Sequence, residues 1–138
     1  MLSSPQLERL RSRAQGLLAE QRALVGALLK VREQIGGSLI ERYVECRKEG
    51  CSCRQGRRHG PYFILSARSG GQGSYAYLNR PQVACVRQLV RRHRDFRERM
   101  RRLQRVNAEL VGVLKRYRAA ATRVGERRVR QASQVAKA

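Results

Sequence analysis

The chain has 138 residues and a formal net charge of +21, with 31 Lys and Arg against 10 Asp and Glu, and 5% of its residues are aromatic. This length suits one ordinary domain with a modest core. A compact monomer with this charge would repel itself, so we expect an anionic partner, and the predominance of arginine favours phosphate groups. The sequence predicts neither secretion nor membrane insertion, because it shows no signal peptide and no run of about 18 apolar residues.

The first helix is expected within residues 1–36. Ser4 stands at the N-cap position and Pro5 at the first helical position, which is a usual start signal. Apolar residues then recur at alternating spacings of three and four, with Gln21 at the one interrupted place: Leu7, Leu10, Ala14, Leu17, Leu24, Leu28, Val31 and Ile35. This pattern predicts a coiled-coil seam that ends at the glycine pair 36–37.

Residues 37–80 lose the helical period and are expected to form a Cys/His knuckle and a small antiparallel sheet of two or three strands. The expected strands lie at 41–46, 61–68 and 74–78, with a glycine-rich turn at 69–73. Alternation along the middle strand puts Phe63 and Leu65 on one face and Tyr62 and Ile64 on the other.

The second helix is expected at residues 81–124, starting at Pro81, and residues 125–138 are expected to form a frayed or disordered basic tail. The predicted seam of the second helix consists of Leu89, His93, Phe96, Met100, Leu103, Asn107, Leu110, Leu114, Tyr117, Ala121 and Val124. Asn107 is a polar residue at a seam position and predicts a partner helix from this chain or from a second copy. We therefore predict an α+β fold in which two long helices form an antiparallel coiled-coil hairpin around a small antiparallel sheet with a zinc knuckle.

A compact group of metal-ligand residues lies in the knuckle. Cys46, Cys51, Cys53 and His59 follow a C-x4-C-x-C-x5-H spacing. Three thiolates and one imidazole suit tetrahedral Zn²⁺, and four protein ligands leave no position for a catalytic water, so the expected zinc is structural. The alternative is a set of buried reduced thiols beside a turn histidine. Cys85, expected to be a small buried apolar residue, is an alternative ligand to His59.

The segment 37–65 resembles a family of small uncharacterised prokaryotic proteins that share a segment of the form RYVxCGKxxCxCxxGxxHGPYYYL. Arg47 stands where that family usually has glycine. The resemblance supports the knuckle and the strands, implies a prokaryotic cytosol or nucleoid as the location, and implies an association with mobile genetic elements, but it carries no settled activity. The matching residues are Cys46, Lys48, Gly50, Cys51, Cys53, Gly56, His59, Gly60, Pro61 and Tyr62.

Arginines and tyrosines are the candidates for contact with nucleic acid. Arginines off the second seam can meet phosphates without disturbing the core, and the few acidic residues nearby cannot balance them. Basic residues of the knuckle lie beside strand tyrosines, and aromatic side chains next to arginines can stack on unpaired bases. The candidate residues are Arg47, Lys48, Arg54, Arg57, Arg58, Tyr62, Tyr75, Tyr77, Arg87, Arg91, Arg94, Arg101, Arg102 and Arg105.

These features predict a nucleic-acid-binding accessory protein, with structured RNA preferred over DNA, as a subunit of a mobile-element nucleoprotein. No nucleophile elbow, phosphate-binding loop or paired-carboxylate site is visible, so the chain is not expected to be an enzyme. Two alternatives remain open: a coiled-coil module that binds a protein partner or a second copy through its seams, and a regulator that responds to zinc or oxidation through its cysteines.

Overall fold

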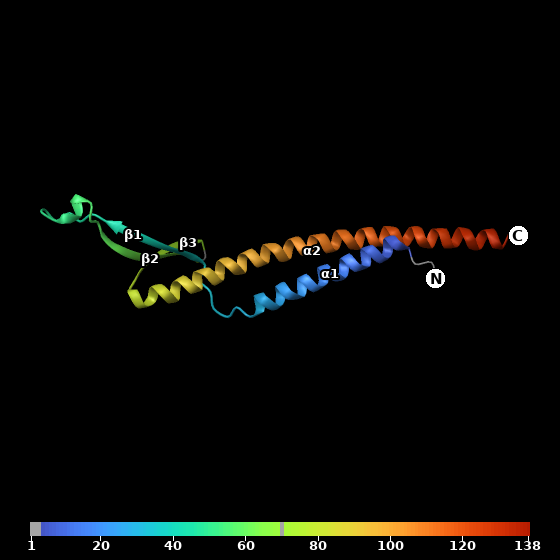
Figure 1. Ribbon diagram of the computed structural model, residues 1–138, viewed down its shortest axis with the longest axis horizontal. Helices are drawn as coiled ribbons and strands as arrows, with labels where there is room; N and C mark the ends of the chain where they lie inside the picture. Colours follow the sequence, from blue (N-terminus) through green and yellow to red (C-terminus); the bar gives the residue numbers. More distant parts are fainter. Residues whose placement is uncertain (1–3, 70) are drawn as a thin grey trace. The chain divides into compact units, whose positions relative to one another are not determined.

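The computed structural model describes residues 4–69 and 71–138 (Figure 1). Two helices and a three-stranded antiparallel sheet make up an α+β chain, as predicted. In chain order the elements are α1 (Pro5–Leu29), β1 (Gly37–Val44), the short 3-10 helix η1 (Ser52–Gln55), β2 (His59–Ser69), β3 (Gln72–Leu78) and α2 (Arg80–Val135).

The chain divides into two compact units. The helical unit consists of Met1–Lys30 and Arg99–Ala138, and the sheet unit consists of Val31–Glu98. Helix α2 is continuous and contributes its first part to the sheet unit and its remainder to the helical unit. Each unit is therefore described by its own packing.

Both helices begin at signals visible in the sequence. In α1, Pro5 is the first helical residue and the N–H of Glu8 donates to the carbonyl of Ser4 at 3.2 Å. At the start of α2, the Asn79 N–H donates to Gln82 Oε1 at 2.9 Å and the Gln82 N–H donates to Asn79 Oδ1 at 3.0 Å. This reciprocal pair satisfies two backbone donors that the first turn of a helix leaves unpaired.

The sheet has the order β1-β2-β3, with both pairs antiparallel. The strands are longer than predicted, and the turn predicted at 69–73 includes Gly70, which lies outside the described residues. Ile64 is buried at the centre of β2 and pairs with Ile40 on β1 and with Tyr77 on β3. Directly paired residues share a face of an antiparallel sheet, so this register determines which side chains lie together.

The core of the helical unit forms between α1 and α2. Leu17, Val106 and Val113 are buried, and the residues packed against them are Leu10, Ala14, Leu24 and Leu110. The members of this core from α1 all belong to the seam predicted for the first helix. Apolar side chains at spacings of three and four therefore do face the partner helix.

The seam predicted for α2 is only half right. The structure agrees at Leu103, Leu110, Tyr117 and Val124, which are half-buried, but the positions between them differ. The buried residues are Val106, Val113 and Ala120, whereas the predicted Asn107, Leu114 and Ala121 each follow one residue later. Leu114 is 51% exposed, while Val113 is fully buried.

The reason for this difference is the way in which α1 and α2 face each other, which the contacts along the two edges of the helix pair define. On one edge Arg13 pairs with Glu109, and Arg102 pairs with Glu20 at 2.6 Å. On the other edge Arg11 donates to Tyr117 at 3.3 Å and Gln21 donates to Asn107 at 2.8 Å. Residue numbers rise on α1 as they fall on α2, so the two helices are antiparallel.

The residues on the second of these edges explain why the sequence pattern predicted the wrong seam positions on α2. Met100, Asn107 and Leu114 are spaced by seven residues, so they share one side of α2 with the contact to Gln21. Met100 and Leu114 are apolar but exposed. Apolar residues thus occupy three positions per heptad, and spacing alone does not tell which two of them form the core.

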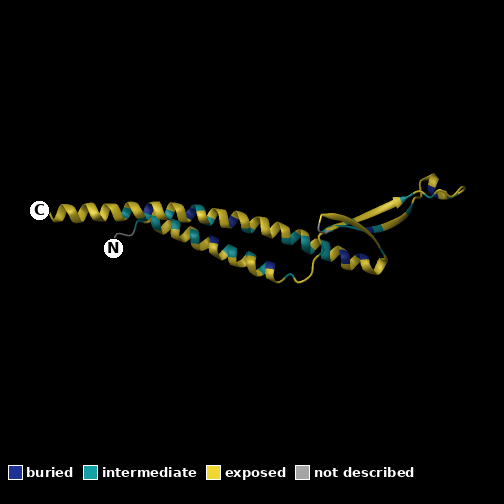
Figure 2. Ribbon diagram, turned by 180° about the vertical axis from the view of Figure 1, so that it is seen from behind, coloured by how far each residue is buried: buried dark blue, intermediate teal, exposed yellow. Residues whose placement is uncertain are grey.

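The helix boundaries also differ from those predicted. Helix α1 ends at Leu29, so the last two predicted seam residues lie beyond it in the sheet unit, where the N–H of Ile35 donates to the carbonyl of Leu89 at 3.1 Å. Helix α2 continues to Val135, so most of the predicted tail 125–138 is helical. Arginine, glutamine and alanine have high helix propensity and continue the helix without a buried seam; this end of α2 is exposed throughout (Figure 2).

Replacing Val113 with alanine is expected to lower the free energy of unfolding of the helical unit by about 2 kcal/mol, because it removes buried methyl groups and leaves a cavity. Replacing Leu114 with alanine removes more atoms but from an exposed side chain, so its cost should stay within about 0.5 kcal/mol. Urea unfolding followed by circular dichroism measures both. Equal losses for the two variants would contradict the observed core.

Candidate metal centre and basic surface

The long connection between β1 and β2 brings the four predicted metal ligands together. The two strands pair at their ends through Val44 and His59. Cys46 follows β1 by two residues, His59 is the first residue of β2, and η1 carries Cys53 with Cys51 at its N-cap. Antiparallel pairing thus holds both ends of the loop close together, and η1 turns the remaining cysteines inward.

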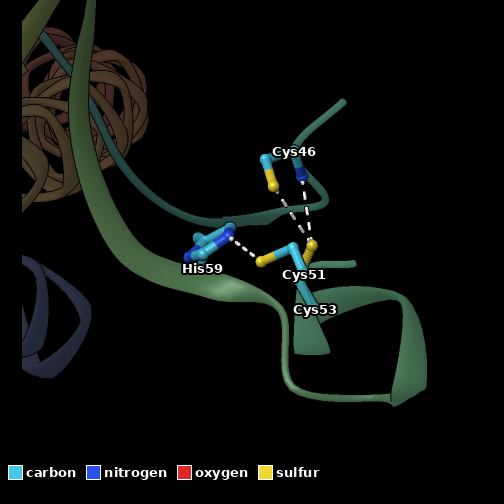
Figure 3. A group of neighbouring side chains, drawn as sticks. All are labelled: Cys46, Cys51, Cys53 and His59. Atoms are coloured by element: carbon cyan, nitrogen blue, oxygen red, sulfur yellow. Dashed lines mark hydrogen bonds between the residues drawn. The ribbon is translucent and has the colours of Figure 1, made fainter. Parts of the chain in front are cut away.

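The ligand atoms of these four residues all lie within 4.8 Å of one another. Cys46 Sγ is 3.5 Å from Cys53 Sγ, and Cys51 Sγ is 3.2 Å from His59 Nε2 (Figure 3). A tetrahedral ion with metal–sulfur bonds of about 2.3 Å would hold its sulfurs roughly 3.8 Å apart. The predicted clustering is confirmed, and the four side chains can hold a metal ion.

The pKa values of two thiols in this cluster are shifted in opposite directions. The backbone N–H of Lys48, with further contributions from His59 and the two neighbouring thiols, lowers the pKa of Cys46 to about 6. Burial raises the pKa of the Cys53 thiol, and the N–H of Cys46 points at its sulfur at 3.4 Å. A bound cation would compensate the charge of thiolates that burial disfavours.

Two glycines shape the backbone around the cluster. Gly56 ends η1 with φ of +102°, in the left-handed region. Gly60, next to the ligand His59, has φ of +137°, and a Cβ on it would lie 2.8 Å from the carbonyl oxygen of Arg42. Any other residue at position 60 would be strained and would push β1 away from β2.

Replacing Gly60 with alanine is expected to destabilise the sheet unit by at least about 2 kcal/mol, because the backbone strain adds to a clash with the neighbouring strand. The same change at Gly73 of β3, where a Cβ would meet nothing within 4 Å, is the matched control. Thermal unfolding and the metal content of both purified variants are the measurements. Metal binding that survives in the Gly60 variant without a loss of stability would contradict this account.

Every basic residue predicted to contact nucleic acid is exposed. The knuckle holds Arg47, Lys48, Arg54, Arg57 and Arg58. Helix α2 holds the others, of which Arg87, Arg91 and Arg94 lie in the sheet unit and Arg101, Arg102 and Arg105 in the helical unit.

Few of these charges are neutralised. Within the described part of the chain, Arg58 lies 3.5 Å from Glu45 and Arg102 pairs with Glu20, while the other candidate cations have no ion pair with a carboxylate. Exposed ion pairs of this kind contribute little stability, and these two pairs leave most of the positive charge of the candidate residues without a carboxylate partner. The basic surface is therefore available to an external anion.

The three predicted tyrosines are also exposed, with Tyr75 at 74%, Tyr77 at 71% and Tyr62 at 44%. The register adds two residues that the sequence analysis did not select: Arg42 pairs with Tyr62, and Arg68 lies two positions beyond Ser66, the partner of Tyr75. Strict alternation extended from Tyr62 along β2 would have identified Arg68. Identifying Arg42 required the register of β1 with β2, which cannot be deduced from the sequence alone.

Cys85 is not part of the cluster. Within the described residues, the metal-ligand group consists of the four knuckle residues, and Cys85 is exposed on α2. The expectation that Cys85 is buried was wrong, because the buried positions of this turn are Val83 and Val86 on either side of it.

Neither α1 nor α2, the two long helices of the described chain, contains an apolar stretch that could span a membrane.

Comparison with known proteins identifies a family. Residues 7–88 match the model of a family described as a domain of unknown function, DUF6788. The matched segment includes nearly all of α1, the sheet, the metal cluster and the start of α2. No curated protein and no solved structure matches the chain.

Proposed function

The chain belongs to the DUF6788 family, whose function is unknown, and we propose that it binds nucleic acid through arginine–phosphate contacts. The supporting observation is the set of exposed cations on α2 and the knuckle that have no carboxylate partner within the described residues. Arginine forms bidentate contacts with phosphate, and clustered unpaired arginines are the electrostatic signature of a surface that binds a polyanion.

We assign zinc to the four-residue cluster, because three thiols and one imidazole at these distances match its preferred ligand set. Cys46, Cys51, Cys53 and His59 would then fix the β1–β2 connection and the basic side chains on it. A site closed by four protein ligands has no position for a reacting water, so the proposed role of the protein is binding rather than catalysis.

The antiparallel pairing of α1 and α2 supports the proposal that they form a coiled-coil hairpin. Such a hairpin would hold the exposed arginines of α2 on a stiff support. RNA is the preferred target, because the exposed tyrosines beside these charges suit unstacked bases. The resemblance to a family associated with mobile elements suggests that the protein accompanies a nucleoprotein whose other components process the nucleic acid.

A salt titration tests the proposed function. Binding of the full chain to a fluorescein-labelled RNA hairpin, measured by anisotropy, should weaken steeply as salt rises from 50 to 200 mM, by about a thousandfold if six phosphates are contacted. Nuclease-treated protein that binds no RNA or DNA at low salt would refute the proposal.

The same titration tests the first alternative, and oxidation of the cysteines tests the second. A helical protein partner bound through apolar side chains should show little change in affinity across this salt range. A regulator that responds to oxidation should lose its metal and change its binding when the cysteines are oxidised. Each outcome would redirect the assignment toward the corresponding class.

A further inference from the structure

One face of the sheet gathers aromatic and cationic side chains. The register pairs Arg42 with Tyr62 and pairs Ile64 with Tyr77, and alternation along each strand extends this face. We call it the tyrosine face; its aromatic and charged members are Tyr62, Tyr75, Tyr77, Arg42 and Arg68.

The two faces of the sheet differ in exposure and charge. Tyr75 and Tyr77 are more than two-thirds exposed, and Arg42 and Arg68 are exposed as well, whereas Ile64 at the centre of the same face is buried. The opposite face carries Glu41, the exposed Tyr43 whose hydroxyl donates to Glu41 at 3.0 Å, and four half-buried side chains: Leu39, Phe63, Leu65 and Leu78. Within the described strands, the tyrosine face has no carboxylate. An exposed aromatic surface with only positive charge is complementary to bases joined by phosphates.

We propose that the tyrosine face binds an extended single strand of nucleic acid, with bases stacked on Tyr75, Tyr77 and Tyr62. Arg42 and Arg68 lie at its margins, where they contact the phosphates that flank the stacked bases. This inference rests on the proposed function and narrows it to unpaired nucleotides at this face. Each tyrosine ring accepts any base, because every base has a π-face, so the proposed recognition tolerates sequence.

The spacing of the rings specifies an unstacked strand. Tyr75 and Tyr77 are two residues apart on β3, which separates them by about 7 Å along the strand. Tyr62 lies diagonally from Tyr77, since its strand neighbour Ile64 is the direct partner of Tyr77, and such diagonal neighbours are also about 7–8 Å apart. Stacked bases lie about 3.4 Å apart, so neighbouring rings hold bases that no longer stack on each other.

The composition of the chain provides a direct readout. It has five tyrosines and no tryptophan, so intrinsic fluorescence reports on tyrosine alone. Addition of a twelve-nucleotide oligouridine should quench this emission if bases stack on the rings. A hairpin RNA without unpaired nucleotides beyond its closing loop should quench less at equal occupancy.

The decisive variant replaces Tyr75 and Tyr77 with alanine, and the matched control replaces both with phenylalanine. Both side chains are exposed, so the variants should fold, which circular dichroism and metal content verify. The alanine variant should bind oligouridine about a hundredfold more weakly, roughly tenfold for each lost ring, while the phenylalanine variant binds within about threefold of the parent. Binding of a duplex through the arginines of α2 should change little in either variant.

The outcomes separate this inference from the proposed function. Equal affinity of all three proteins for oligouridine would overturn the tyrosine face as the stacking site while leaving salt-dependent binding intact. A failure of the parent protein to bind any nucleic acid would remove both. If the alanine variant keeps its affinity but changes its oligomeric state in light scattering, the face is a contact between protein chains and the inference is wrong.

Discussion

Replacing Cys53 with serine should remove the metal from the purified protein, from about one zinc ion per chain to none, and unfold the sheet unit. The buried apolar side chains described in that unit are Cys53, Ile64, Val83 and Val86, which is a small core for a three-stranded sheet. Structural zinc contributes about 10–16 kcal/mol of apparent binding free energy in zinc-finger peptides, more than such a core supplies. Metal analysis and amide hydrogen exchange of β1 and β2 measure the effect.

Cys85 provides the matched control, because it is a cysteine of the same unit that lies outside the cluster and is exposed. Its replacement with serine should leave metal content and exchange rates unchanged. The exchange rates of the helical unit should be similar in both variants, since its core contains no metal ligand. A Cys53 variant that keeps its sheet protected in the presence of a chelator would show that packing alone holds the knuckle.

Replacing Arg94, Arg101 and Arg105 with glutamine should weaken nucleic-acid binding by about a hundredfold at 0.1 M salt. These exposed residues are spaced by seven and four positions and therefore form one stripe along α2. Each lost phosphate contact lowers the slope of log affinity against log salt by about 0.7–0.9, so the slope should fall by roughly two to three. Anisotropy titrations at several salt concentrations measure both quantities.

Lysine at the same three positions is the control. Lysine keeps the charge and has a helix propensity close to those of arginine and glutamine, so the three proteins should be equally stable. The lysine variant should retain most of the salt slope and lose only the affinity that depends on bidentate geometry. If the glutamine variant keeps the slope of the parent, the contact surface lies elsewhere.

The metal cluster was the most predictable part of the molecule. Its four ligands lie within fourteen residues of sequence, so their chemistry and spacing were sufficient to group them, and the segment 61–68 after them was rich in aromatic and β-branched residues. The identity of the metal rests on chemical preference. The length of β1, which starts at Gly37 instead of 41, depends on pairing with β2 that a single segment does not reveal.

The helices were predicted in kind but not in detail. Helix α1 also has a third apolar position, at the exposed Leu18 and Val25, but its core residues all belong to the predicted seam. In α2 a third apolar position at Met100 and Leu114 made two seams equally consistent with the sequence, and contact with α1 through Val106 and Val113 decides between them. The end of α2 was misplaced because propensity, without burial, continues a helix past its last seam residue.

The length of α2 bears on how many copies would coat a nucleic acid. Its 56 residues extend over about 84 Å and carry 17 Arg and Lys against four Asp and Glu, or about one excess positive charge every 6.5 Å. Double-stranded nucleic acid has one phosphate per ~1.7 Å of axis. One α2 helix laid along a duplex would offset only about a quarter of the phosphates that it covers. A stretch of duplex as long as α2 could therefore accept several chains before its net charge reversed. Saturation should occur at well above one protein per such stretch.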